Sequence, residues 1–208
     1  MEVRTERLWA KQNQHEGDRL RLFTAVAETV EAVSVLYPGS FVDVAPSFVF
    51  PSVTYADSDR RAALFFADVD GVDEIIATSA IDDRPRSVEF HGGDYRHDLD
   101  LDDGRFDLLI SLYAGFVSEA CTRYLRIGGT LLVNSSHGDA AMASIDERYQ
   151  LAAVVTSAKG RYRVSSEDLG RYLIPKKPQD LSPETLHELG RGIAYTTAPF
   201  AYLFRRVA

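Results

Sequence analysis

The sequence contains a single cysteine, Cys121, so the chain can form no disulfide with itself. It contains no G-x-G-x-x-G, the glycine pattern of dinucleotide-binding turns. No charged segment followed by an apolar stretch opens the chain, and no apolar run is long enough to cross a bilayer. From these absences we expect a cytoplasmic protein with no membrane partner.

Positive charge is also scarce. The chain has 23 Lys and Arg residues against 31 Asp and Glu, a net charge of -8. Contacts with nucleic-acid phosphates need clustered cations, so we expect a small-molecule substrate and no nucleic acid. Only short basic patches occur, Lys176-Lys177 and Arg205-Arg206. Nothing in the sequence indicates the oligomeric state.

The length suits one α/β domain. With 208 residues, of which 45% are hydrophobic, the chain can bury one substantial core. No linker and no internal repeat divides it. We therefore expect a single domain over residues 1–208, in which residues 1–17 form an N-terminal arm or helix.

Apolar runs that alternate with helical patterns indicate the fold class. The periodicity predicts helices over residues 19–32 (capped by Asp18), 60–66 (ended by Gly71) and 118–125, the last with Cys121 as a packing residue. Strands are predicted over residues 33–37, 52–56, 87–90, 106–112 and 130–134. This alternation is typical of a parallel sheet with helices on both faces. The runs 33–37 and 106–112 are the most continuously apolar, so we expect them to be central.

The last third of the chain has a different character. Residues 149–156 and 161–164 flank a turn at residues 158–160, which indicates a hairpin. Ser182 followed by Pro183 is typical of the start of a helix. Residues 202–207 are expected to form the final strand.

Residues 33–59 are the most informative segment, because they combine a buried strand, a glycine turn and a second strand that ends in an acidic residue. Gly39 allows a sharp turn and a close approach of the backbone to a ligand. Asp57 follows the second strand, where a carboxylate binds ribose hydroxyls in Rossmann-like folds. The alternative is that Asp57 or Asp59 caps a helix that starts at Arg60. Both interpretations remain open at this point.

Two further motifs carry a family resemblance. One is the predicted strand that begins Phe106-Asp107, and the other is the turn at residues 125–129, which ends in Gly128-Gly129. Together they resemble the Rossmann-like class I S-adenosylmethionine-dependent methyltransferases. The YPGS turn and the ending GRGIAYTTAPFAYLFRR look like a bacterial subgroup of that superfamily. The resemblance covers most of residues 19–207. It implies a three-layer α/β sandwich with a mostly parallel sheet, an antiparallel C-terminal strand and S-adenosylmethionine as cofactor.

The resemblance also assigns cofactor contacts. The glycine loop, the ribose-binding acid and the adenine-side acid of the family fall on Tyr37, Pro38, Gly39, Ser40, Asp57 and Asp94. The chain departs from the family pattern because only one glycine of the usual loop is present. Asp43 is a candidate for the missing acid near the methionine end of the cofactor.

The methyl acceptor is expected beyond the fourth strand, near residues 111–115, since open α/β sheets bind ligands at the carboxyl ends of their strands. Tyr113 is a catalytic candidate that orients the acceptor or takes its proton. The alternative for Tyr113 is a packing role. His137, after the fifth strand, is a second candidate, which lines the acceptor pocket. The alternative is that His137 lies in a solvated loop.

Two other kinds of site are disfavoured. Residues 135–139 contain Ser, His and Asp, but residues so close along a chain rarely converge as a hydrolase triad, and the G-x-S-x-G elbow is absent. His91 and His97 lie near Asp94 and Asp98 in a spacing that matches no standard zinc pattern, so we expect no metal.

Three function hypotheses follow. The first is an S-adenosylmethionine-dependent methyltransferase that acts on a small molecule. The second is a non-catalytic Rossmann-like protein that binds an adenine-containing ligand or a protein partner, which the reduced glycine loop favours. The third is a nicotinamide-dependent oxidoreductase, which the missing glycine fingerprint disfavours.

Overall fold

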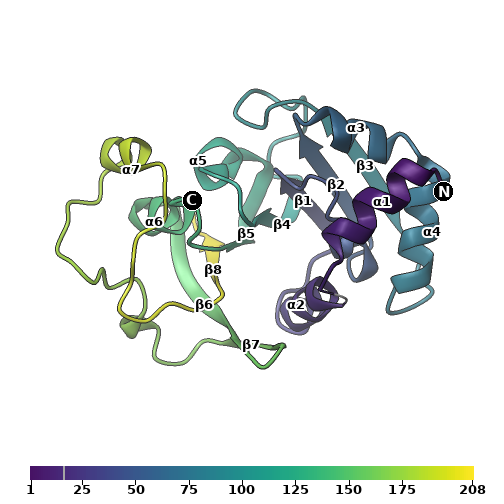
Figure 1. Ribbon diagram of the computed structural model, residues 1–208. Helices are drawn as coiled ribbons and strands as arrows, with labels where there is room; N and C mark the ends of the chain where they lie inside the picture. The colour runs from purple at the N-terminus through teal and green to yellow at the C-terminus, as the bar shows by residue number, and fades with distance from the viewer. Residues whose placement is uncertain (16) are drawn as a thin grey trace.

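The computed structural model describes residues 1–15 and 17–208. The strands in this part of the chain form one eight-stranded sheet in the order β3-β2-β1-β4-β5-β8-β6-β7 (Figure 1). The strands are β1 Ser34–Pro38, β2 Ser52–Asp57, β3 Ser87–Gly92, β4 Phe106–Ser111, β5 Leu125–Val133, β6 Tyr149–Ala158, β7 Arg161–Ser165 and β8 Ala201–Arg206.

Strands β1 to β5 are mutually parallel, whereas β8 runs antiparallel to both β5 and β6. Strand β1 lies between β2 and β4, and β4 lies between β1 and β5. The predicted central strands, the antiparallel last strand and the hairpin of β6 and β7 are therefore confirmed. The architecture is a Rossmann-like sandwich with a mostly parallel sheet.

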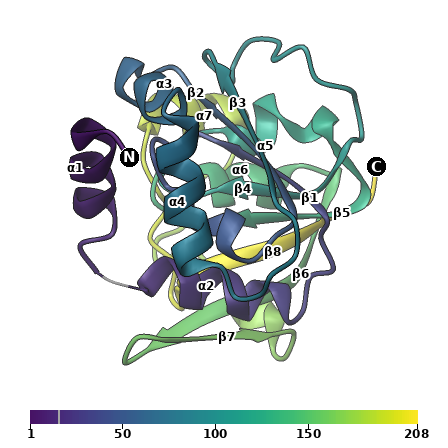
Figure 2. The ribbon, with the colours of Figure 1, turned by 90° about the vertical axis from the view of Figure 1, so that its right-hand side faces the viewer.

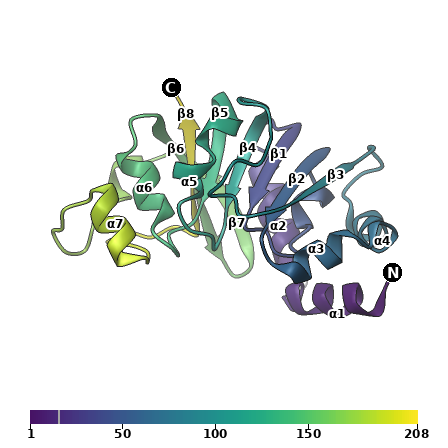
Figure 3. The same ribbon diagram turned by 90° about the horizontal axis from the view of Figure 1, so that it is seen from above.

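The helices cover both faces of the sheet (Figures 2 and 3). One face packs against α1 to α4 through one set of alternate strand residues, and the other packs against α5 to α7 through the other set. The helices are α1 Val3–Gln12, α2 Asp18–Ala27, α3 Arg60–Phe66, α4 Val69–Ser79, α5 Val117–Ala120, α6 Asp139–Ile145 and α7 Pro183–Leu189, with short 3-10 helices η1 Ala45–Phe48, η2 Thr122–Tyr124 and η3 Leu169–Arg171. Helix α1 is the outermost, beyond α3 and α4.

The helix before β1 is shorter than predicted. It begins at Asp18 with Gly17 as its N-cap, and it ends at Ala27 instead of residue 32. The Asp18 carboxylate does not cap the helix, because it pairs with Arg21 and accepts a hydrogen bond from the Tyr162 hydroxyl at 2.9 Å. The cap prediction and the helix end were both wrong.

The predicted end of the next helix at Gly71 was also wrong. Helix α3 ends at Phe66, and Gly71 lies within the first turn of α4. Asp68 starts this second helix, since its carboxylate accepts a hydrogen bond from the Gly71 N–H at 3.2 Å.

The predicted helix over residues 118–125 is only one turn of α-helix, Val117–Ala120, followed by η2. Strand β5 already begins at Leu125, so Gly128 and Gly129 lie inside the strand instead of before it. Gly128 has a φ of +80°, which a bulky side chain adopts only with strain. Cys121 is fully buried, as a packing residue should be, and burial raises the pKa of its thiol to about 12.

The connection from β1 to β2 contains the 3-10 helix η1 and no α-helix, although parallel crossovers usually carry one. Helix α1 covers part of this area, because Trp9 packs edge-on against Phe48 of η1 with 5.7 Å between ring centroids. The connection returns to the amino end of β1, where the Ser52 N–H donates to the Val33 carbonyl at 3.1 Å.

Helix α7 begins as predicted at Pro183, with a capping box between Ser182 and Thr185. In the described part of the chain, no helix combines the length and the apolar character that a bilayer span requires.

Candidate functional site

The sheet has a switch point between β1 and β4, where the strand order reverses direction. Open α/β sheets bind ligands outside the carboxyl ends of the strands at such a point. The loops after β1, β2, β4 and β5 all start at this edge. They contain most of the residues that the sequence singles out.

Gly39 lies at the end of β1 with a φ of +66°, and its N–H donates to the Ala56 carbonyl at 2.8 Å. A Cβ on Gly39 would stand 2.8 Å from the Cβ of Ala114, in the loop after β4. The glycine therefore serves a close contact between two loops of the protein. Its neighbours Tyr37 and Ser40 are buried.

Asp57 joins the loop after β1 to the end of β2. Its two carboxylate oxygens accept hydrogen bonds from the N–H groups of Phe41 and Asp59, each at 2.7 Å. Asp59, not Asp57, caps α3, because it accepts from the Arg61 N–H. Asp57 is half-buried, and a carboxylate oxygen can accept two hydrogen bonds, so each oxygen keeps capacity for a ligand hydroxyl.

Asp94, after β3, forms a fork with Arg96. The Arg96 Nη2 lies 2.5 Å from Oδ2, and the Arg96 N–H donates to Oδ1 at 3.0 Å. These hydrogen bonds lower the pKa of Asp94 to about 2. The carboxylate is ionised near neutral pH and largely paired within its own turn.

Asp43 is buried behind the loop after β1. Its Oδ2 lies 3.3 Å from Arg19 Nε and accepts a hydrogen bond from the Tyr37 hydroxyl at 3.3 Å. The same Arg19 guanidinium lies over the ring of Tyr113, 5.1 Å from its centroid. This network links α2 to the loops after β1 and β4.

A cavity of about 340 Å³ lies against these residues. Its walls come from the end of α1, the start of α2 and the loops after β1 and β4, with the lining residues Lys11, Gln12, Asn13, Gln14, His15, Asp18, Arg19, Phe41 and Tyr113. Its volume is at the small end of the usual range for ligand pockets. The cavity is adjacent to the switch point of the sheet.

Tyr113 is half-exposed and has a φ of +61°, an uncommon conformation for a non-glycine residue. Its N–H donates to Oδ1 of Asn134 at 3.3 Å, which ties the loop after β4 to the end of β5. The ring is thereby held at the cavity wall.

His137 belongs to a short relay after β5. Ser136 Oγ donates a hydrogen bond to Asn134 Oδ1 at 2.8 Å, and it lies 2.8 Å from His137 Nδ1. Because the hydroxyl proton is directed to the amide oxygen, Ser136 Oγ accepts from Nδ1–H. The neutral imidazole then carries its lone pair on Nε2, and the His137 side chain is exposed.

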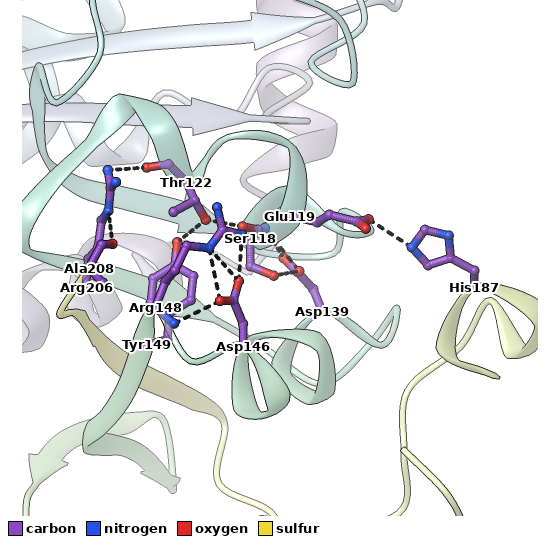
Figure 4. A network of polar contacts seen from close by, with 10 residues as sticks. All are labelled: Ser118, Glu119, Thr122, Asp139, Asp146, Arg148, Tyr149, His187, Arg206 and Ala208. Carbon is purple, nitrogen blue, oxygen red and sulfur yellow. Dashed lines mark hydrogen bonds and ion pairs between the residues drawn. The ribbon is translucent and has the colours of Figure 1, made fainter. Parts of the chain in front are cut away.

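Asp139 does not join that relay. It is fully buried at the start of α6, where its carboxylate accepts hydrogen bonds from the Ser111 hydroxyl and from the hydroxyl and N–H of Ser118. Figure 4 shows Ser118 and Asp139 pointing toward one another. Burial raises the pKa of Asp139. Residues 135–139 thus form no hydrolase triad.

The side chain of His91, in β3, is also engaged otherwise. His91 Nε2 lies 2.9 Å from a carboxylate oxygen of Glu89. Among the described residues, no three His, Cys, Asp or Glu side chains are grouped to hold a metal ion.

No family model and no curated protein matches the sequence. Solved structures do match. A candidate O-methyltransferase from Klebsiella pneumoniae has a TM-score of 0.51 and 12% identity, over 79% of this chain and 88% of that chain. The YcgJ protein from Bacillus subtilis has a TM-score of 0.48 and 15% identity over 91% and 98%. An O-methyltransferase from Bacillus cereus, solved with S-adenosylhomocysteine, has a TM-score of 0.46 and 12% identity over 79% and 89%. The first of these matches shows that the chain has the Rossmann-like fold found among methyltransferases, as the sequence motifs predicted.

Proposed function

We propose that this chain is an S-adenosylmethionine-dependent methyltransferase that acts on a small molecule. The observation that carries the proposal is the cavity at the switch point, next to a carboxylate that ends β2. The fold, similar to that of the Klebsiella pneumoniae protein, supports it.

The residues around the cavity fit the cofactor. Asp57 has lone pairs left for ribose hydroxyls, Lys11 offers positive charge to a carboxylate, and Phe41 and Tyr113 provide aromatic walls. In this proposal Tyr37, Pro38, Gly39 and Ser40 shape the loop after β1, and Asp94 bounds the adenine side.

The cofactor would supply an activated methyl group, so the protein mainly has to position the acceptor and take its proton. His137 Nε2 is free to accept that proton, because Ser136 and Asn134 fix the other ring nitrogen as the donor. Tyr113 lies beside this relay through its bond to Asn134 and orients the acceptor.

Replacing His137 by Gln should lower the methyl-transfer rate by about 10²-fold or more, the usual contribution of a general base. Binding of S-adenosylhomocysteine should not change, since His137 is not among the residues that line the cavity. Rates and titrations on wild type, His137→Gln and the control His97→Gln test this. His97 is exposed and outside the relay. Equal rates for the two variants would exclude the role.

A specific observation favours a second function, a non-catalytic protein that binds an adenine-containing ligand. The backbone of Gly39 is covered by Ala114, and both oxygens of Asp57 already have backbone partners. A nicotinamide-dependent oxidoreductase is less well supported, because β8 runs antiparallel beyond β5 where a second dinucleotide-binding half would continue in parallel.

Incubation with methyl-labelled S-adenosylmethionine separates these functions. One sample receives a small-metabolite extract and the other receives total cellular RNA and DNA. Label in the small-metabolite pool would support the proposal. Specific label in nucleic acid would overturn the choice of substrate, and label in neither pool would favour the non-catalytic function.

A further inference from the structure

We propose that a second groove, beside the end of β5, binds the phosphate or carboxylate group of a small anionic molecule. The groove has a volume of about 330 Å³. Its cations are Lys176, Lys177 and Arg191, and it is also lined by Gln179, Leu189 and Ile193. The claim that this molecule is the methyl acceptor rests on the proposed function. The claim that the groove binds an anion does not.

The groove is built by residues 166–200, which we call the excursion because they leave the sheet between β7 and β8. Two of its segments pair as a short antiparallel ribbon. The Lys176 N–H donates to the Ala194 carbonyl at 2.8 Å, and the Thr196 N–H donates to the Ile174 carbonyl at 2.9 Å. The backbone beneath Lys176 and Lys177 is therefore held by hydrogen bonds.

The side of the groove formed by α7 is also anchored. His187 Nε2 lies 2.8 Å from a carboxylate oxygen of Glu119, which joins α7 to α5 (Figure 4). The His187 ring also packs against Phe116, with 4.5 Å between ring centroids. These contacts fix the position of Leu189, the last residue of α7.

The excursion rests directly on the loop that carries His137. The Gly192 N–H donates to the Ser136 carbonyl at 3.2 Å. The Arg191 carbonyl oxygen lies 3.2 Å from where a Cβ on Gly138 would stand. The groove and the Ser136–His137 relay are consequently neighbours.

The charge of the groove is uncompensated. Among the described residues, no carboxylate forms an ion pair with Lys176, Lys177 or Arg191, although the chain as a whole carries a net charge of -8. Arg148, by contrast, pairs with Asp146, with 2.6 Å between Nη2 and Oδ2. A concave surface with one sign of charge concentrates ions of the opposite sign.

The apolar part of the lining defines the rest of the ligand. Leu189 is 39% exposed and Ile193 forms part of the wall, so the groove offers an apolar surface beside its cations. A small ring or short chain that carries one anionic group matches both features. The structure thus assigns an anionic, partly apolar small molecule to this groove.

An NMR titration tests the assignment with phenyl phosphate, benzoate and the neutral control benzyl alcohol. Either anion should shift the backbone amide signals of Lys176, Arg191, Gly192 and His137, whereas benzyl alcohol should not. The two anions distinguish phosphate from carboxylate. Added salt should weaken the binding, because the attraction is electrostatic.

The double variant Lys176→Gln/Lys177→Gln should weaken anion binding about tenfold or more, since it removes two charged hydrogen-bond donors. Lys159→Gln is the matched control, because Lys159 is exposed in the turn between β6 and β7. Absent shifts, equal binding of benzyl alcohol, or unchanged affinity in the double variant would overturn the proposal.

Addition of S-adenosylhomocysteine to the same samples separates the two claims. Anion binding without cofactor binding would overturn the methyltransferase proposal and leave the groove as an anion site. Cofactor binding without anion binding would overturn the anion site and leave the methyltransferase proposal standing.

Discussion

Replacing Asp139 by Ala should lower the free energy of unfolding by about 2–4 kcal/mol. The carboxylate is fully buried and accepts hydrogen bonds from the side chains of Ser111 and Ser118 and from the Ser118 N–H. Without it, three buried donors lose their acceptor, and each unsatisfied donor destabilises the folded state. Urea denaturation of both proteins measures the difference.

The control for this variant is Asp102→Ala, which removes an exposed carboxylate from the loop before β4 and should leave the stability nearly unchanged. A loss below about 1 kcal/mol for Asp139→Ala would show that the buried hydrogen bonds do not stabilise the fold as described.

The stability should also depend on pH through Asp139. Burial raises its pKa in the folded protein, so the folded state binds a proton more tightly than the unfolded state does. The stability that comes from this tighter proton binding is fully present below the unfolded pKa of about 3.9. It is lost as the pH rises through the pKa that Asp139 has in the folded protein. The difference in unfolding free energy between wild type and Asp139→Asn should therefore fall as the pH rises above about 4. A difference that rises or stays constant over that range would contradict this.

Replacing Gly192 by Ala should displace the excursion from the His137 loop. A Cβ at this position would stand 1.7 Å from the Ser135 carbonyl oxygen, so one of the two backbones has to move. We expect a loss of about 2 kcal/mol or more in the free energy of unfolding. Amide signals around Ser136 and His137 should shift as well, and the affinity of the groove for phenyl phosphate should fall.

Gly170 provides a matched control within the same excursion. A Cβ there meets no atom within 4 Å, so Gly170→Ala should change neither stability nor the signals of the His137 loop. If Gly192→Ala behaves like Gly170→Ala, the close contact between the excursion and that loop is excluded.

Much of the fold follows from local sequence. The strands around Val35 and Leu109 are continuously apolar because the sheet buries both of their faces, and that pattern is legible without a structure. The helix ends were harder to predict. Asp18 looks like a cap, yet its carboxylate binds Tyr162 across 144 residues of sequence.

The candidate site shows the same limit. Asp57 was predicted from its place after β2, but its bond to the Phe41 N–H depends on how the preceding loop folds back. The link from Asp139 to Ser111 and Ser118 joins residues that are 28 and 21 positions apart. The bond from the Gly192 N–H to the Ser136 carbonyl brings the cationic groove to the His137 loop, and no local pattern indicates it.

The central claim is that the carboxyl edge of the sheet binds the methyl-donor cofactor through Asp57. Isothermal titration of S-adenosylhomocysteine into wild type and Asp57→Ala tests it most directly, with Asp57→Asn as a second variant and unfolding measured in parallel. Loss of hydrogen bonds to a charged group should weaken binding by about 1.5–3 kcal/mol in Asp57→Ala. Measurable binding to wild type with that loss in a folded variant is the expected result. No binding to wild type, or equal affinity in folded Asp57 variants, would contradict the account.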